Sequence, residues 1–267
     1  MITGLDHVAI AVRDFAAATD AYRRLLGREP ELEPRDGAER AWFHLANMAL
    51  EVISPSADGP AGDRVRARLD AAGEGQWIVA FQSDDVAAGA RLLSRRGLEV
   101  EPYRDVARVQ AAGLDFVLTP GRIGAQPSPP IADEAAAIPA LDHVVVGTPN
   151  PDRALGIYGA KFGLDLRLDR ANEAWGARQL FFRCGSAVFE VGASLKRPVS
   201  DDPDRFGGLA WRVTDPDAAQ ARIAAAGFDV SEVRAGRKPG TKVFTVRNAP
   251  GGTPTLMIQQ TPQTEAA

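Results

Sequence analysis

The sequence has few of the residues that staple a fold, bind a metal through sulfur or cross a membrane. Its 267 residues include one cysteine, Cys184, so it can form neither an intrachain disulfide nor a thiolate-rich zinc site. No segment approaches the roughly 18 consecutive apolar residues that suggest a membrane span. Met1 leads almost directly into a strand-like segment, without the regions of a signal peptide. We therefore expect a cytoplasmic globular protein.

An excess of positive charge and the motifs of several enzyme classes are also absent. The formal net charge is −4, which gives no overall attraction to nucleic acid or to a membrane surface. The sequence contains no GxxxxGKS/T, HExxH or GxSxG motif and no GxGxxG after a strand, which argues against nucleotide binding and serine hydrolysis. We expect a small-molecule substrate as the partner of a monomer or homodimer.

An internal repeat organises the chain. The segment Leu5-Asp6-His7-Val8 returns as Leu141-Asp142-His143-Val144, and Tyr22 and Gly27 return as Tyr158 and Gly163, all at an offset of 136 residues, while Glu51 returns as Glu190 after a small insertion. A fixed offset of this kind is typical of duplicated structural units. We expect two domains, at 1–120 and 140–262, a proline-rich linker at 121–139 that contains a short helix, and a tail at 263–267.

Each half contains a finer repeat of a strand, a capped helix and further strands. Helices are predicted from Asp14 to Gly27, Asp84 to Gly97, Asn150 to Gly163 and Asp215 to Gly227, because Asp and Asn cap first turns and Gly ends helices. Short extended runs follow the helices at 41–45, 50–53, 100–103, 115–118, 179–183, 188–191, 242–246 and 255–259. The pattern predicts an α+β protein built from four β-α-β-β-β modules.

Three segments carry a resemblance to a known family. A strand beginning LDHVAIAV, a helix ending YRRLLG and a strand MALEVISP resemble the vicinal oxygen chelate superfamily of glyoxalases, bleomycin resistance proteins and extradiol dioxygenases. The segments LDHVVVG and AVFEVGAS repeat the pattern in the second half. The resemblance implies two tandem incomplete-barrel domains, each made of two modules, with a divalent metal held on the concave side by the first and fourth strands of the modules.

The resemblance places the metal ligands, which are also the catalytic candidates, at His7 and Glu51 in module one and at His143 and Glu190 in module three. Such a set suits Zn, Mn, Fe, Co or Ni. The matching positions of module two fall on Ile78 and Phe116, and those of module four on Gly208 and on Leu256 or Ile258, none of which binds a metal. Pairing of modules one and three would complete a four-ligand set, whereas any other pairing leaves one His and one Glu in each cavity. The presence of a metal therefore stays open.

Strand alternation suggests further site residues. Gln82 shares a face with Ile78, and Arg212 shares one with Gly208, so we expect Gln82, Arg212 and Phe116 to contact substrate. The alternative for Arg212 is a surface salt bridge. His44 is either a third ligand or a solvent-facing strand residue, and Cys184 is expected to be a packing residue.

Two functions of different classes follow from these residues. The first is a glyoxalase-like lyase, isomerase or epimerase acting on a small oxygenated metabolite, with the repeated His and Glu residues moving a proton. The alternative is a metal-free binding protein of the bleomycin-resistance kind, which the apolar Ile78 and Phe116 favour. A ring-cleaving dioxygenase comes third, because Gly208 and the apolar last strand leave its two-histidine, one-carboxylate iron site incomplete.

Overall fold

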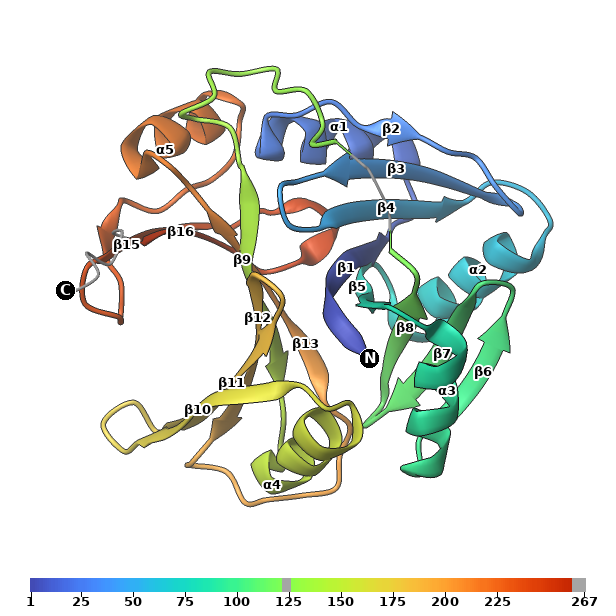
Figure 1. Cartoon of the computed structure of the whole chain (residues 1–267). Helices are drawn as coiled ribbons and strands as arrows, with labels where there is room; N and C mark the ends of the chain where they lie inside the picture. The colour runs from blue at the N-terminus through green and yellow to red at the C-terminus, as the bar shows by residue number, and fades with distance from the viewer. Residues whose placement is uncertain (122–125, 261–267) are drawn as a thin grey trace.

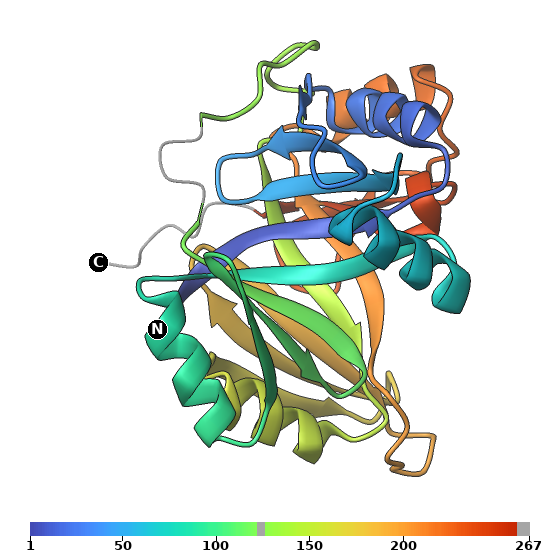
Figure 2. The same ribbon diagram turned by 90° about the vertical axis from the view of Figure 1, so that its right-hand side faces the viewer.

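The chain forms two eight-stranded mixed sheets of identical topology (Figures 1 and 2). The computed structural model describes residues 1–121 and 126–260. The first sheet has the order β2-β3-β4-β1-β5-β8-β7-β6 and the second the order β10-β11-β12-β9-β13-β16-β15-β14. Modules one and two therefore share a sheet, as do modules three and four, which confirms the predicted α+β fold.

The first sheet contains β1 (Ile2–Ala11), β2 (Glu31–Leu32), β3 (Ala38–His44), β4 (Ala49–Pro55), β5 (Gly75–Ser83), β6 (Glu99–Tyr103), β7 (Val106–Ala111) and β8 (Leu114–Thr119). The second contains β9 (Ala140–Gly147), β10 (Asp165–Asn172), β11 (Ala177–Cys184), β12 (Ala187–Ser194), β13 (Arg205–Arg212), β14 (Arg234–Ala235), β15 (Thr241–Val246) and β16 (Thr255–Gln260). The central strands β1 and β9 each lie parallel to the last strand of their own module and antiparallel to the first strand of the next.

The helices begin and end close to the predicted caps. Helix α1 (Phe15–Leu26) follows Asp14, whose side chain accepts a hydrogen bond from the Ala17 amide, and ends at Gly27 with a φ of 67°. Helix α5 (Pro216–Ala225) follows Asp215 as predicted, whereas α3 (Val86–Arg95) is capped by Asp85, one residue later than expected. The fourth predicted helix starts at Asn150 as α4 (Pro151–Ala154) and continues as the π-helix η1 (Leu155–Lys161).

One helix was not predicted. Helix α2 (Pro60–Ala72) lies between β4 and β5, and packs Val65 and Leu69 against the face of the first sheet that carries Ile53 and Ile78. Within the described residues, no helix connects β12 to β13 in the second half. Helix α2 therefore makes the surroundings of the first concave face different from those of the second.

The opposite faces of the two sheets share one core. Phe81 and Phe116 from the first sheet pack against Phe162 and Phe189 from the second half, with ring centroids 5.0 to 6.2 Å apart. Helices α1 and α5 lie side by side at one end of the molecule, and α3 and the α4–η1 helix lie side by side at the other (Figure 2). The two domains are joined by a buried apolar interface and not by the linker alone.

Helix ends hold the domains together through reciprocal hydrogen bonds. Arg24 of α1 donates to the Ala226 carbonyl at the end of α5, and Arg222 of α5 donates to the Arg24 and Leu25 carbonyls. Burial lowers the pKa of Arg222 to about 10, which leaves it charged at neutral pH. Where α3 meets η1, Arg96 donates to the Lys161 carbonyl and Lys161 donates to the Gly97 carbonyl.

The described part of the linker, 126–139, forms turns and contains no helix, unlike the prediction. It packs on the end of α1, where the buried Arg28 donates to the Ser128 and Ile138 carbonyls. The expected tail at 263–267 lies outside the described residues. No helix in the described part of the chain is both long and apolar enough to cross a membrane. Cys184 is buried as a packing residue, and burial raises the pKa of its thiol to about 12.

Candidate active site

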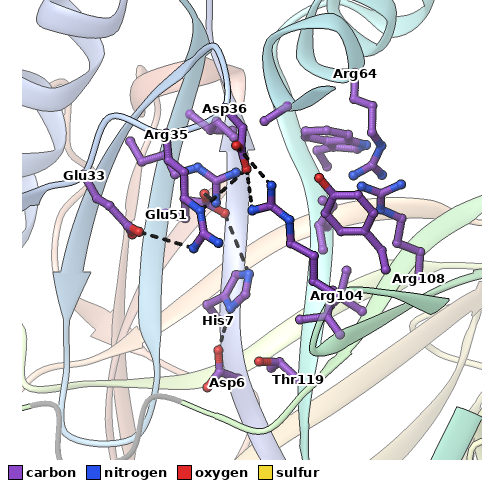
Figure 3. Close-up of a pocket in the computed structure, with 18 of the residues that line it drawn as sticks. Asp6, His7, Glu33, Arg35, Asp36, Glu51, Arg64, Arg104, Arg108 and Thr119 are labelled. Carbon is purple, nitrogen blue, oxygen red and sulfur yellow. Dashed lines mark hydrogen bonds and ion pairs between the residues drawn. The ribbon is translucent and has the colours of Figure 1, made fainter. Parts of the chain in front are cut away.

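A cavity of about 370 Å³ lies on the concave side of the first sheet (Figure 3). Strands β1, β3, β4, β5, β7 and β8 contribute to its walls, together with α2 and the turns around Asp36 and Arg104. Arg104 donates to Asp36 over a distance of 2.8 Å and so links the two turns. The lining of the cavity is rich in ionisable side chains, which are those of Asp6, His7, Glu33, Arg35, Asp36, Arg40, Glu51, Arg64, Arg104, Asp105 and Arg108.

His7 and Glu51 meet in this cavity, as the sequence predicted. Parallel pairing of β1 with β4 sets Ala9 beside Glu51, so the His7 side chain reaches the same wall. His7 Nε2 lies 3.7 Å from Glu51 Oε2, and His7 Nδ1 lies 2.6 Å from Asp6 Oδ2. In the neutral tautomer that donates Nδ1–H to the Asp6 carboxylate, Nε2 keeps its lone pair toward the cavity and can accept a proton.

Arg40 adds a positive charge beside Glu51. Its Nη1 lies 3.1 Å from Glu51 Oε1, but the two groups are not aligned for a hydrogen bond. Glu51 Oε1 and Arg40 Nε are buried atoms for which the described residues supply no hydrogen-bond partner. Buried polar atoms rarely stay unpaired, so this wall offers polar contacts to a bound molecule or to water.

The second sheet repeats the constellation. His143 Nδ1 lies 2.8 Å from Asp142, and His143 Nε2 lies 3.4 Å from Glu190. Gln179, which takes the place of Arg40, donates to Glu190 over 2.7 Å. The C-terminal arrangement thus keeps the imidazole and both carboxylates but has an uncharged amide where the N-terminal one has a guanidinium.

Asp142 is held as a charged group. Burial by itself would raise the pKa of its carboxyl, but the hydrogen bond from His143 and the positive charges of His143 and Arg212 outweigh it and leave the pKa below its ordinary value. Arg212 lies 3.3 Å from Asp142 Oδ2 and also donates to the Ser186 carbonyl. Arg212 therefore orients Asp142, and through it His143, while its contact with substrate stays a prediction.

The structure places Phe116 away from the cavity, contrary to the expected orientation. Phe116 is 1% exposed and belongs to the aromatic core between the sheets. The parallel pairing of β5 with β8 puts Val117, one residue later, in the position equivalent to Glu51, and Val117 lines the cavity. A shift of one residue along a strand moves a side chain to the other face, which accounts for the difference.

Two other predicted positions lie apart from the His7–Glu51 pair. Gln82 stands at the far end of β5, is absent from the cavity lining and packs closely against Gly121. His44 is neither of the expected alternatives: it is buried, and its Nε2 lies 2.9 Å from Glu31. In the second sheet, the position equivalent to Glu190 falls on Leu256, which pairs with Ala210.

The residues present do not fit a typical metal centre. His7 and Glu51 belong to one sheet, and His143 and Glu190 to the other, so the four candidate ligands do not form one set. Among the described residues, no group of three or more His, Cys, Asp or Glu side chains is arranged to hold a metal ion. Ile78 and Val117 occupy the remaining ligand positions of the first cavity, and Arg40 already sets a positive charge beside Glu51.

Sequence reasoning did not identify several residues of this site. Asp6 and Asp142 were visible as part of the repeated Leu-Asp-His-Val segment, and their repetition was the signal that could have assigned them. Arg64 comes from the unpredicted α2, and Arg108 from the unpredicted β7. No sequence pattern connects these two arginines with His7, because only the folded sheet brings them to one cavity.

Comparisons with known proteins give the family. A sequence model of the Glyoxalase/Bleomycin resistance protein/Dioxygenase superfamily matches residues 6–119 and again residues 142–245. An ethylmalonyl-CoA/methylmalonyl-CoA epimerase of Cereibacter sphaeroides is 33% identical over 134 residues, which are 48% of this chain and 86% of that protein. These matches confirm the resemblance that the repeated strand segments indicate.

Solved structures share the whole arrangement. A variant of 4-hydroxymandelate synthase from Streptomyces coelicolor superposes with a TM-score of 0.74 at 18% identity, covering 97% of this chain and 93% of that chain. A halotolerant catechol dioxygenase superposes with a TM-score of 0.71 at 12% identity, covering 97% and 87%. Identities this low establish the tandem fold and leave the reaction to the chemistry of the site.

Proposed function

Because the chain belongs to the Glyoxalase/Bleomycin resistance protein/Dioxygenase superfamily, we propose that it is an enzyme of the isomerase or epimerase kind. Its reaction is the transfer of a proton at a carbon next to a carbonyl group of a small oxygenated metabolite. The proposal depends on one observation: His7 and Glu51 stand 3.7 Å apart on the wall of a cavity of substrate size. The relative from Cereibacter sphaeroides, which is named an epimerase, supports the same class of reaction.

His7 is the proposed base. Its Nε2 takes the proton as the electron pair of the C–H bond moves toward the carbonyl and an enolate forms. Asp6 holds Nδ1–H, which fixes the ring and stabilises the imidazolium that results. The negative charge of Glu51 favours that imidazolium, and Glu51 is the second group able to carry the proton. Delivery of a proton to the opposite face of the enolate carbon gives an epimer, delivery to a neighbouring atom gives an isomer, and return to the original face restores the substrate.

The N-terminal domain is the proposed site of this chemistry. Its His7–Glu51 pair lies in a cavity that α2 lines on one side. The buried atoms Glu51 Oε1 and Arg40 Nε there have no hydrogen-bond partner among the described residues and can bind a substrate. No step is assigned to a metal, because the donor set of the cavity does not match one. The C-terminal His143 and Glu190 are a second candidate pair with an uncharged neighbour in Gln179.

Exchange of a substrate C–H for deuterium tests the proposal. Methylmalonyl-CoA, ethylmalonyl-CoA and smaller 2-substituted carbonyl acids are incubated with the protein in D₂O, and the C–H signal is followed by NMR. We expect catalysed loss of that signal at a rate that dialysis against EDTA does not change, with metal analysis of the same sample as the control. Absence of exchange across this panel, or exchange that returns only with an added metal, contradicts the proposal.

A ligand-binding protein without catalysis is the second candidate. The observation that favours it is the apolar pair Ile78 and Val117, together with Trp42 and Trp77 in the same cavity wall. Apolar and aromatic walls enclose a ligand well. Saturable quenching of tryptophan fluorescence by compounds that undergo no exchange supports this candidate over the enzyme.

A further inference from the structure

Two arginines face the same space in the cavity. Arg64 comes from α2 and Arg108 from β7, and both belong to the cavity lining. Their guanidinium groups point toward one another in Figure 3, on the other side of the cavity from His7. Two cations that converge repel one another, and although the charges of Asp115 and Glu101 also act on Arg64, a bound anion would stabilise the pair further.

The other arginines of this cavity each have a carboxylate nearby. Arg40 lies beside Glu51, while Arg35 and Arg104 lie beside Asp36. Among the residues that the structure describes, Arg108 forms an ion pair only with Glu101, at 3.3 Å, and the Glu101 side chain is 68% exposed, so solvent screens the pair. Within the described residues, Arg64 has neither a carboxylate within 4.0 Å nor a hydrogen-bond partner.

Aromatic rings hold the two guanidinium groups in place. Arg64 Cζ lies 5.3 Å from the centroid of the Trp77 ring, and Arg108 Cζ lies 3.9 Å from that of Tyr103. Trp77 is itself fixed, because its Nε1 donates to Asp115 over 2.8 Å. Stacking occupies the faces of the guanidinium groups, so an anion can approach their N–H edges, of which the Nη1 of Arg108 also donates to the exposed Glu101. Burial first, and then the charge of Arg108, lower the pKa of Arg64 despite the opposing charges of Asp115 and Glu101, and a bound anion would raise it again.

We propose that Arg64 and Arg108 form an anion subsite that binds a carboxylate or phosphate group of the substrate. This inference rests on the proposed function, because it supplies the group that anchors the molecule whose C–H bond faces His7. The described part of the second domain has no helix in the place of α2, so the subsite belongs to the N-terminal cavity. It restricts the substrate to anionic oxygenated compounds.

Calorimetric titration of the whole chain with inorganic phosphate, and separately with malonate, tests the subsite. We expect Arg64→Gln and Arg108→Gln each to weaken anion binding by about tenfold or more, because each removes a charge-assisted hydrogen bond. Arg66→Gln is the matched control: Arg66 lies on the same helix but pairs with Asp63 outside the cavity lining, so affinity should not change. Arg64→Lys keeps the charge without the planar fork, and should fall between the wild type and Arg64→Gln.

The probe that binds identifies the chemistry of the anion, phosphate or carboxylate. The subsite is refuted if neither probe binds the wild type, or if Arg64→Gln and Arg108→Gln, with unchanged circular dichroism, bind as tightly as the wild type. The titration needs no turnover, so its result is independent of the proposed function. Anion binding that depends on the two arginines, without C–H exchange, supports the subsite and contradicts the proposed enzyme. Exchange that depends on His7 but not on Arg64 supports the enzyme and contradicts the subsite.

Discussion

Replacing His7 with asparagine should slow deuterium exchange by about 10²–10⁴-fold, the range expected for loss of a positioned general base. The asparagine amide can still donate to Asp6, as His7 Nδ1 does, but it has no basic nitrogen to accept the substrate proton. Since His7 is a partly buried wall residue, the fold should survive the change. Exchange rates of the wild type and variant, compared at saturating substrate, measure the effect.

His44→Asn is the matched control for that experiment. His44 is the one other histidine of the N-terminal domain, and it bonds Glu31 outside the cavity lining, so exchange should continue at the wild-type rate. The assignment to the N-terminal cavity is wrong if His7→Asn exchanges normally and His143→Asn does not. That outcome would assign the proton transfer to His143 and Glu190 of the C-terminal domain.

Replacing Phe116 with alanine should destabilise the protein by about 3–5 kcal/mol, the usual cost of deleting a buried phenylalanine. Phe116 packs on rings from both halves, including Phe81 at 5.8 Å and Phe162 at 5.0 Å between centroids. The cavity left by its removal would lie at the junction of the two domains. Urea unfolding followed by circular dichroism gives the change in the free energy of unfolding.

Val117→Ala is the comparison for Phe116→Ala. Val117 lines the cavity, so its truncation should change substrate affinity with a smaller loss of stability than Phe116→Ala causes. If the Phe116→Ala protein unfolds at the same urea concentration as the wild type but no longer binds substrate, Phe116 contacts substrate and its assignment to the core is wrong. The pair of variants thus tests the strand register directly.

Local sequence signals anticipated much of the architecture. Asp14 with Gly27, and Asp215 with Gly227, mark helix ends because capping is a property of a few consecutive residues. The adjacency of His7 and Glu51 was also predictable, because the family pattern puts both on the concave side of one module. The module pairing was not, since the same strands can close a sheet with different partners, and only the tertiary structure selects one.

The wrong orientation predicted for Phe116 and the failure to predict α2 have separate physical reasons. Strand faces alternate with a period of two, so an alignment of β8 with β4 that is wrong by one residue exchanges Phe116 for Val117. Helix α2 buries few large apolar side chains, mainly Val65 and Leu69, which gives a weak periodic signal. The repeat could not assign Arg64 to the site, because the second half of the chain lacks this helix.

The central claim is that His7 and Glu51 move one proton as a unit, and a double-mutant cycle on the exchange rate tests it most directly. Groups that act together give losses that are far from additive. We predict that His7→Asn combined with Glu51→Gln exchanges no more slowly than the slower single variant. A double variant whose loss equals the product of the two single losses would show that the residues act independently, and would contradict the account.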